Sequence, residues 1–411
     1  MNSIDHARQK VESVIEIINS VRELDFPYDD PWEAVEFIRE HFKKLLIHLK
    51  SINDVNAARN ICKKVSDEID NYLFAVGFMV RACDIQGALE LQGPLLRLTH
   101  RAIGSHAKLV ISSEWRYSPF TLLYPDEFGD KFVLVGLPVS EAGNPLIAPA
   151  AGHELGHNIW SRLPELQEFV GREIRDKVTG KIKGEKWDQF QNVFNLSNKE
   201  QVGQEDLFDD VYWRVAMQWG VSQCEEIFCD FIGLCVFGEG YLHAFHYLLS
   251  PGGGFRNPAY PSMSHRISAL QSASATLGVV VPDRFSEEFD DSDVSSDPKQ
   301  QLLLKTSDEA SQELVPRLVE HALTFCEKKE LVARDKADVK RIFDTFKRVV
   351  PATGAKSLAN IINAAWQISL DNVNHWAVDY PATRKPEKRI ELIRELALKS
   401  FEVFEIERIQ E

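Results

Sequence analysis

Apolar residues recur with the period of a helix at the start of the chain. Five of them lie three or four positions apart: Val11, Val14, Ile15, Ile18 and Val21. Residues with this spacing share one face of a helix, which a globular protein buries. Similar apolar runs follow from Pro31 to Leu49 and from about residue 55 to Ile103. The pattern predicts a helical region over residues 1–105.

After residue 105 the pattern changes to short β-branched and apolar runs. Residues 108–113, 120–124 and 131–138 form these runs, and Pro, Gly and Asp bound them. Runs of this length and composition are typical of strands. A mostly helical pattern then returns. We therefore expect an α+β chain that is mostly helical, with a core of small sheet and helices over residues 106–283.

Residues 284–303 interrupt the helical pattern. Their sequence is acidic, rich in Ser and poor in apolar residues. Such a composition is typical of a linker or loop. Apolar residues return at helical spacing beyond it, with Pro residues as breaks. The sequence thus predicts an acidic linker or loop at residues 284–303 and a C-terminal helical region over residues 304–411.

Charge and composition exclude several classes of partner. The chain carries a net charge of -15 over 411 residues, which argues against nucleic acid or an anionic membrane surface as a partner. No run approaches 18 apolar residues, so we expect no integral membrane segment. The six Cys include no C-x-x-C pair, and the first residues lack an apolar leader. Free thiols in a reducing compartment, and hence a cytoplasmic location, are the expectation.

The segment PAAGHELGHNIW, residues 149–160, carries candidate metal chemistry. His153 and His157 are four positions apart, so on a helix both imidazoles reach one metal ion. Glu154 then lies beside the ion, where it can take a proton from a water. Pro149 suits the first position of that helix. The motif predicts a metal site but needs a third ligand.

A later apolar helix offers that ligand. In CEEIFCD, Glu226 and Asp230 lie one helical turn apart. Glu226 is the predicted ligand, and Asp230 is predicted to accept the second N–H of a ligand histidine. Two carboxylates on so apolar a helix are costly unless a cation receives them. Glu225 is the alternative ligand if the helix is rotated. A second alternative is the nearby pair His243 and His246.

The combination of H-E-L-G-H with E-x-x-x-D resembles the gluzincin metallopeptidases, and most of all the family that includes the CAAX prenyl proteases. That family carries H-P-x-x-x-x-R-[IL]-x-x-L further along. Four residues match this third motif: Pro261, Arg266, Ile267 and Leu270. The resemblance covers about residues 107–275. It implies a zincin-like core that holds one Zn²⁺ per chain through His153, His157 and Glu226, with Glu154 as general base.

Two departures from the family pattern matter. Tyr260 stands where the family has the histidine before the proline, although a tyrosine hydroxyl can also donate to a developing oxyanion. The family is typically embedded in membranes, and this chain has no spanning run, so a membrane-bound prenyl-protein substrate is not carried over. We expect Tyr260 or His265 to stabilise the oxyanion. Arg266 is expected to pair with a buried carboxylate such as Asp230.

The strand before the motif helix has two interpretations. In zinc peptidases of this type, an edge strand pairs with the extended substrate backbone. The residues in position to do so are Phe132, Val133, Leu134, Val135 and Gly136. The alternative is a strand that belongs to the core only.

Two functions remain in competition. The first is a zinc-dependent metallopeptidase that hydrolyses a peptide or protein substrate, with Glu154 assisting the attack of water; regulation in stress or defence would suit such an enzyme. The second is a catalytically latent or degenerate gluzincin domain that binds a protein partner through its helical flanks. A binding protein has no need of the base, so the intact Glu154 favours the enzyme.

Overall fold

The computed structural model describes residues 3–51, 58–83, 89–124, 126–141, 143–203, 212–252, 254–332, 335–371 and 385–410. The chain forms two compact units, residues 1–144 and 145–411. Each unit has its own packing and is described by itself.

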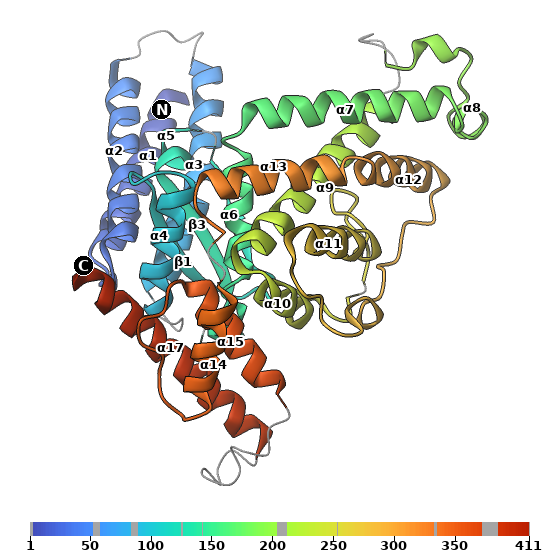
Figure 1. Cartoon of the computed structure of the whole chain (residues 1–411). Coiled ribbons are helices and arrows are strands. Elements are labelled where there is room, and N and C mark those ends of the chain that lie inside the picture. Colours follow the sequence, from blue (N-terminus) through green and yellow to red (C-terminus); the bar gives the residue numbers. More distant parts are fainter. Residues whose placement is uncertain are drawn as a thin grey trace. The chain divides into compact units, whose positions relative to one another are not determined.

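Three long helices form most of the first unit: α1 (Ser3–Arg22), α2 (Asp29–Ser51) and α3 (Ala58–Cys83). They lie side by side (Figure 1). The periodic residues that the sequence singled out, among them Val11 and Ile18, are buried between these helices. The predicted amphipathic faces are therefore the faces that build this core.

A three-stranded sheet completes the first unit. Its strands are β1 (Lys108–Glu114), β2 (Phe120–Leu122) and β3 (Phe132–Pro138), in the order β1-β3-β2. β3 is parallel to β1, with Lys108 opposite Phe132, and antiparallel to β2. Two helices accompany the sheet: α4 (Gln92–Ala102) and α5 (Glu127–Lys131).

The sheet shares one apolar core with the N-terminal helices. Val110 and Leu134 of the sheet belong to the same buried cluster as Phe42 and Phe78 of the helices. The unit boundary therefore falls near residue 144, whereas the sequence placed a boundary at residue 105. Apolar periodicity predicts which residues are buried, but not which element covers them.

Helix α9 (Tyr212–Phe237) is the centre of the second unit. The helices that pack against it include α6 (Ala150–Trp160), α7 (Pro164–Lys183), α11 (Met263–Leu277), α12 (Pro298–Gln312) and α13 (Val315–Lys328) (Figure 1). The second half of α9 is buried on all sides, as expected for a helix that is apolar around its whole circumference. Its few polar residues therefore lie in the interior.

Helices α12 and α13 begin the predicted C-terminal helical region, yet they pack directly on α9. Of the acidic segment predicted as a linker or loop over residues 284–303, residues 289–297 lie outside helices and contact the chain near Pro251 and Arg256, whereas residues 298–303 already belong to α12. The amide of Asp290 donates to Pro251 O at 2.6 Å, and the amide of Arg256 donates to Asp293 O at 2.9 Å. The segment therefore anchors α12 to the loop that follows α10 (Glu239–Leu249).

Helix α15 (Leu358–Leu370) contacts the turn before α6 and the C-terminal end of α9. Asn363 donates to Phe237 O at 2.7 Å and accepts from the amide of Gly240 at 2.9 Å, so it bridges the break between α9 and α10. Trp366 donates to Leu146 O at 3.0 Å, just before α6. We call these two residues the α15 clamp.

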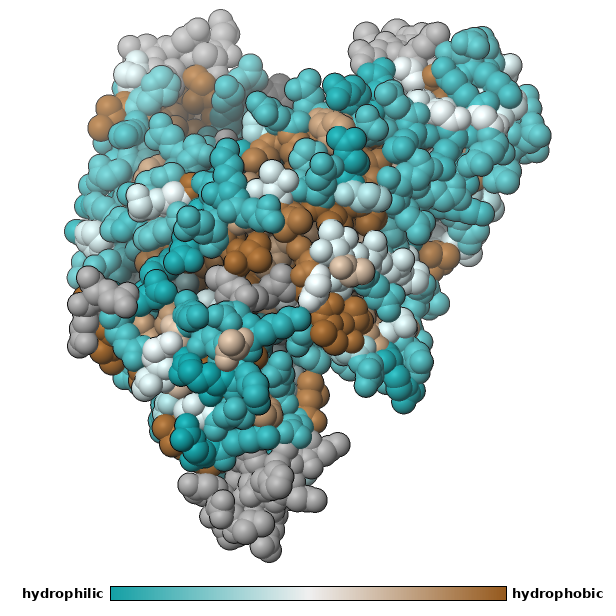
Figure 2. Space-filling view, in the orientation of Figure 1, coloured by the Kyte–Doolittle hydropathy of each residue, from teal (hydrophilic) through white to brown (hydrophobic). Residues whose placement is uncertain are grey.

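The remaining described elements are α8 (Trp187–Phe194), α14 (Lys336–Phe346), α17 (Pro386–Gln410) and five short 3-10 helices: η1 (Leu89–Leu91), η2 (Val139–Glu141), η3 (Pro145–Ile147), η4 (Lys199–Gln201) and η5 (Phe285–Glu288). The prediction of a mostly helical chain with a small sheet is confirmed. Among the described residues, no helix combines the length and apolar character needed to cross a membrane. Hydrophilic residues cover most of the visible surface of α7 and α8 (Figure 2).

Candidate metal centre

Glycines bring the motif helix α6 unusually close to α9. A Cβ atom on Gly156 would lie 2.7 Å from the Cα of Cys229, and one on Gly152 would lie 2.9 Å from the ring of Phe237. Real Cβ atoms essentially never approach other heavy atoms so closely. The two glycines of the motif segment therefore permit a helix contact that brings the histidines of α6 to the carboxylates of α9.

The structure brings the three predicted ligands together. One ligand atom from each of His153, His157 and Glu226 lies within 4.8 Å of the other two, so the group could hold a metal ion. Nε2 of His153 is 3.4 Å from Oε2 of Glu226, and Nε2 of His157 is 3.6 Å from Oε1. Atoms about 2.0–2.2 Å from a common ion have separations of this order.

A carboxylate orients each of the two ligand histidines through a hydrogen bond to its Nδ1. Nδ1 of His153 donates to Asp230 at 2.9 Å, and Nδ1 of His157 donates to Glu225 at 2.9 Å. These bonds leave both Nε2 atoms for a metal, the usual arrangement around ligand histidines. The role predicted for Asp230 is confirmed. Glu225, the alternative ligand, instead holds the second histidine.

Asp230 is itself fixed by two further side chains. Arg266 donates to it through Nε at 2.8 Å and through Nη2 at 2.6 Å, and the hydroxyl of Tyr241 donates at 2.6 Å. The predicted pairing of Arg266 with Asp230 is therefore confirmed. Burial would raise the pKa of Asp230, but Arg266 and His153 outweigh it and hold the pKa far below its ordinary value. The carboxylate stays charged.

The electrostatics of the site favour a positive charge at its centre. Burial lowers the pKa of His153, but the neighbouring carboxylates of Asp230 and Glu226 outweigh it and raise the pKa to about 10. Burial raises the pKa of Glu226, but the contact with His153 lowers it overall. Oε2 of Glu226 is buried and has no hydrogen-bond donor within the part of the chain that the structure describes. A cation would satisfy this oxygen, so the residues fit a metal ion.

Glu154 shares the interior of the site. Its residue is 5% exposed, and burial raises the pKa of its carboxyl, against the opposing effect of His153 and His157. A carboxyl whose pKa moves up towards neutrality is suited to take up and return a proton. Its environment thus agrees with the role expected from the motif.

Tyr260 and His265, the two predicted oxyanion donors, lie in different surroundings. The carboxylate of Glu226 is the largest cause of a raised pKa of Tyr260, followed by burial and by Glu154, so the hydroxyl interacts electrostatically with two carboxylates of the site. His265 interacts instead with Asp308 and Arg256, and burial lowers its pKa. No interaction of His265 with the three ligands is present among the described residues, so the structure favours Tyr260.

His243 and His246, the second alternative for the ligand, lie apart from the cluster. The ring of His243 stacks on Trp366 at 5.3 Å, and burial lowers its pKa to about 4. The ring of His246 lies 5.5 Å from that of Phe289. Within the described chain, the group that could hold a metal includes neither of them.

The expectation that β3 is an edge strand that pairs with substrate is wrong. β3 is the central strand of its sheet, and β1 pairs with it along residues 132–138. β2 pairs with residues 134–136 from the other side. All seven residues of β3 are buried, including the five predicted to bind substrate: Phe132, Val133, Leu134, Val135 and Gly136. With β1 beside its whole length, β2 beside residues 134–136 and every residue buried, β3 is a core strand.

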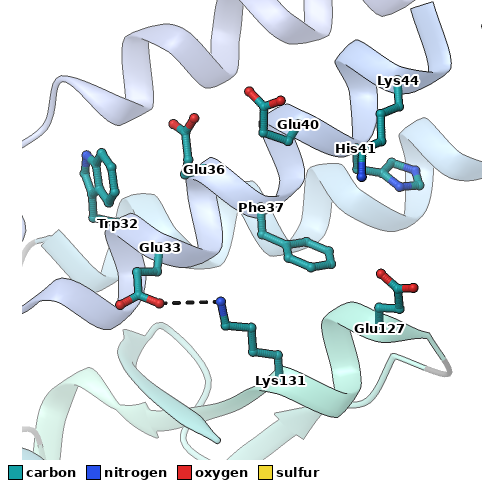
Figure 3. A pocket seen from close by; sticks show the side chains of 9 residues that line it. All are labelled: Trp32, Glu33, Glu36, Phe37, Glu40, His41, Lys44, Glu127 and Lys131. Carbon is teal, nitrogen blue, oxygen red and sulfur yellow. Dashed lines mark ion pairs between the residues drawn. The ribbon is translucent and has the colours of Figure 1, made fainter. Parts of the chain in front are cut away.

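The first unit contains a separate cavity of about 340 Å³ beside α2 and α5 (Figure 3). Trp32 and Phe37 line it together with four glutamates, and Glu33 points to Lys131 at 3.5 Å. Lys108 also contacts Glu33, at 3.0 Å. The lining carries four glutamates against two lysines, and the cavity contains none of the candidate metal ligands.

Sequence reasoning missed two features of the site. Tyr241 has no motif that could identify it, because its contact with Asp230 depends on the turn between α9 and α10. The close packing of Gly152 and Gly156 had a signal in the small residues of AAGHELGH, where each glycine faces α9.

Comparison of the chain with protein-family models, with curated proteins and with solved structures found no match. The residues and geometry of the site are therefore the basis on which a function is inferred.

Proposed function

We propose that the chain is a zinc-dependent metallopeptidase of the gluzincin type, built on a zincin-like core. One observation carries the proposal. Two imidazoles, each oriented by a carboxylate on Nδ1, direct Nε2 at a buried glutamate whose second oxygen lacks a donor in the described structure. Two histidines and one glutamate with an open fourth position form a ligand set typical of catalytic zinc.

Zinc in such a site polarises a water and a substrate carbonyl. The chain's own residues supply the proton transfers. The carboxylate of Glu154 takes the proton from the attacking water and returns it to the departing amine. Its burial supports this double role, because a raised pKa makes the proton both acceptable and transferable.

We assign Tyr260 the role of oxyanion donor. Its hydroxyl lies near Glu226 and Glu154 and keeps its proton because both carboxylates raise its pKa. A neutral phenol near the ligands can donate a hydrogen bond to the oxygen on which negative charge develops. The residue is 44% exposed, so a substrate can reach it.

The supporting residues keep the ligands in one orientation. Asp230, held by Arg266 and Tyr241, fixes the first imidazole, and Glu225 fixes the second. A buried carboxyl such as Glu154 is costly, and a protein that only binds a partner has no use for it. This cost favours the enzyme over the binding domain.

The test is cleavage of a complex peptide mixture by the zinc-loaded protein and by Glu154→Gln, read by mass spectrometry, with zinc content measured for both. We expect one zinc per chain in each and cleavage by the wild type alone. Equal cleavage by the two proteins, or a wild type that binds no zinc, would refute the proposal.

A further inference from the structure

A buried arginine joins α12 to the main chain of Tyr260. Nη1 and Nη2 of Arg256 donate to the two carboxylate oxygens of Asp308 at 2.8 and 2.5 Å. Nε and Nη2 donate to Tyr260 O at 3.1 and 2.9 Å. The side chain of Arg256 is only 7% exposed. One guanidinium thus connects a helix of the C-terminal region to the candidate oxyanion donor.

A second contact ties the same loop to the ligand helix. Gln223 lies on α9, one helical turn before Glu226, and is fully buried. Its amide nitrogen donates to Pro258 O at 3.1 Å, and its oxygen accepts from the hydroxyl of Ser311 on α12 at 2.8 Å. The loop before Tyr260 is therefore anchored to both α9 and α12.

The chemistry of these contacts suits positioning. The segment from residue 254 to residue 260 has few backbone hydrogen bonds of its own; the amide of Tyr260 donates to Asn257 O at 3.0 Å. A rigid, planar guanidinium with several donors fixes a carbonyl and a carboxylate at once, which a lysine cannot do. Burying such a charge is worthwhile only where its partners are well placed.

We propose that Arg256 and Asp308 are positioning residues that hold Tyr260 and its loop beside the ligand helix α9. This inference rests on the proposed peptidase function and adds a role for α12 in it. The C-terminal helical region then supplies part of the catalytic geometry. His265 interacts electrostatically with the same ion pair.

A double-mutant cycle tests the action through Tyr260. We expect Arg256→Lys and Asp308→Asn each to lower kcat about tenfold, with KM and zinc content unchanged, because a small misplacement of a catalytic group is costly. In a Tyr260→Phe background the same changes should cost less than twofold. Equal losses in both backgrounds would overturn the proposal. Arg284→Lys, in an exposed pair with Glu287, is the matched control and should be fully active.

Hydrogen exchange gives a readout that does not depend on cleavage. Arg256→Lys should speed amide exchange over residues 254–262 about tenfold and leave residues 223–231 of α9 unchanged. Unchanged exchange in the loop, or equal acceleration in α9, would overturn the positioning role. If the proposed peptidase function is wrong, the wild type will cleave no peptide. If the positioning role of Arg256 and Asp308 is wrong, hydrogen exchange in the loop will not change. The two failures are therefore distinguishable.

Discussion

Replacement of Gly156 by alanine tests whether the α6–α9 contact sets the metal site. The added Cβ would lie 2.7 Å from the Cα of Cys229, 2.9 Å from its Cβ and 3.1 Å from its sulfur. The nearest of these is backbone, so no rotamer change relieves the overlap. The helices must move apart by several tenths of an ångström.

The magnitude follows from two opposing effects. Overpacking of a tight core contact costs about 1–3 kcal/mol. Alanine in place of glycine in a helix returns about 0.5–1 kcal/mol. We therefore expect Gly156→Ala to lower the free energy of unfolding by roughly 1–2 kcal/mol. Because His157 is the next residue, its displacement from Glu226 should weaken zinc binding by about tenfold, or ~1.4 kcal/mol.

The assays are urea unfolding of the metal-free protein and competition for zinc with a chromophoric chelator. Gly171→Ala is the matched control: Gly171 is also helical, in α7, but a Cβ there meets nothing within 4 Å. That variant should gain about 0.5–1 kcal/mol and bind zinc normally. If Gly156→Ala behaves like Gly171→Ala in both assays, the close contact does not determine the site.

Three other predictions follow from the site and its surroundings. Asp230→Asn should lower zinc affinity about 10–100-fold, measured by chelator competition, because the amide cannot hold His153 and Arg266 as the carboxylate does; unchanged affinity would contradict the orienting role. Removing zinc from the loaded protein with a chelator should lower Tm, and added zinc should restore it, because a ligand that binds only the folded state stabilises it; a Tm that does not respond would contradict metal binding. Burial lowers the pKa of His243 from an ordinary 6.5 to about 4, so the unfolded chain binds an extra proton between these values. The contribution of His243 to stability should be complete above pH 6.5 and fall by roughly 3 kcal/mol towards pH 4, and His243→Phe should flatten this fall in pH-dependent urea unfolding; an identical pH dependence in the variant would exclude His243 as its source.

The sequence predicted which side chains come together at the site better than it predicted the grouping of the elements. His153 and His157 share a helix face by spacing alone, and the cost of burying Glu226 and Asp230 in an apolar helix pointed to a cation. These are local arguments, and the structure brings the same residues together. Glu225 illustrates the limit, since one step of helix rotation decides whether a carboxylate faces the metal or a histidine.

The pairing of strands and the contacts between residues far apart in the chain could not be predicted from the sequence. A seven-residue apolar run such as residues 132–138 reads the same for a central strand and an edge strand, because burial of both faces does not show which sides are paired. The role of Arg256 depends on Asp308, 52 positions away. Nothing in the local pattern connects these two residues, and only the packing of α12 on α9 places them together.

The α15 clamp has a consequence for how the protein folds during its synthesis on the ribosome. His153 emerges long before Trp366 and Asn363, which hold the turn before α6 and the break after α9. At roughly 5–20 residues per second, the ~200 residues between them take about 10–40 s to synthesise. During that interval the nascent chain contains both histidines of α6 but not yet Asn363 and Trp366, the residues that fix the chain around α6 and α9. Completion of the centre is thus coupled to translation of the C-terminal helices, which delays its maturation until most of the chain has been made.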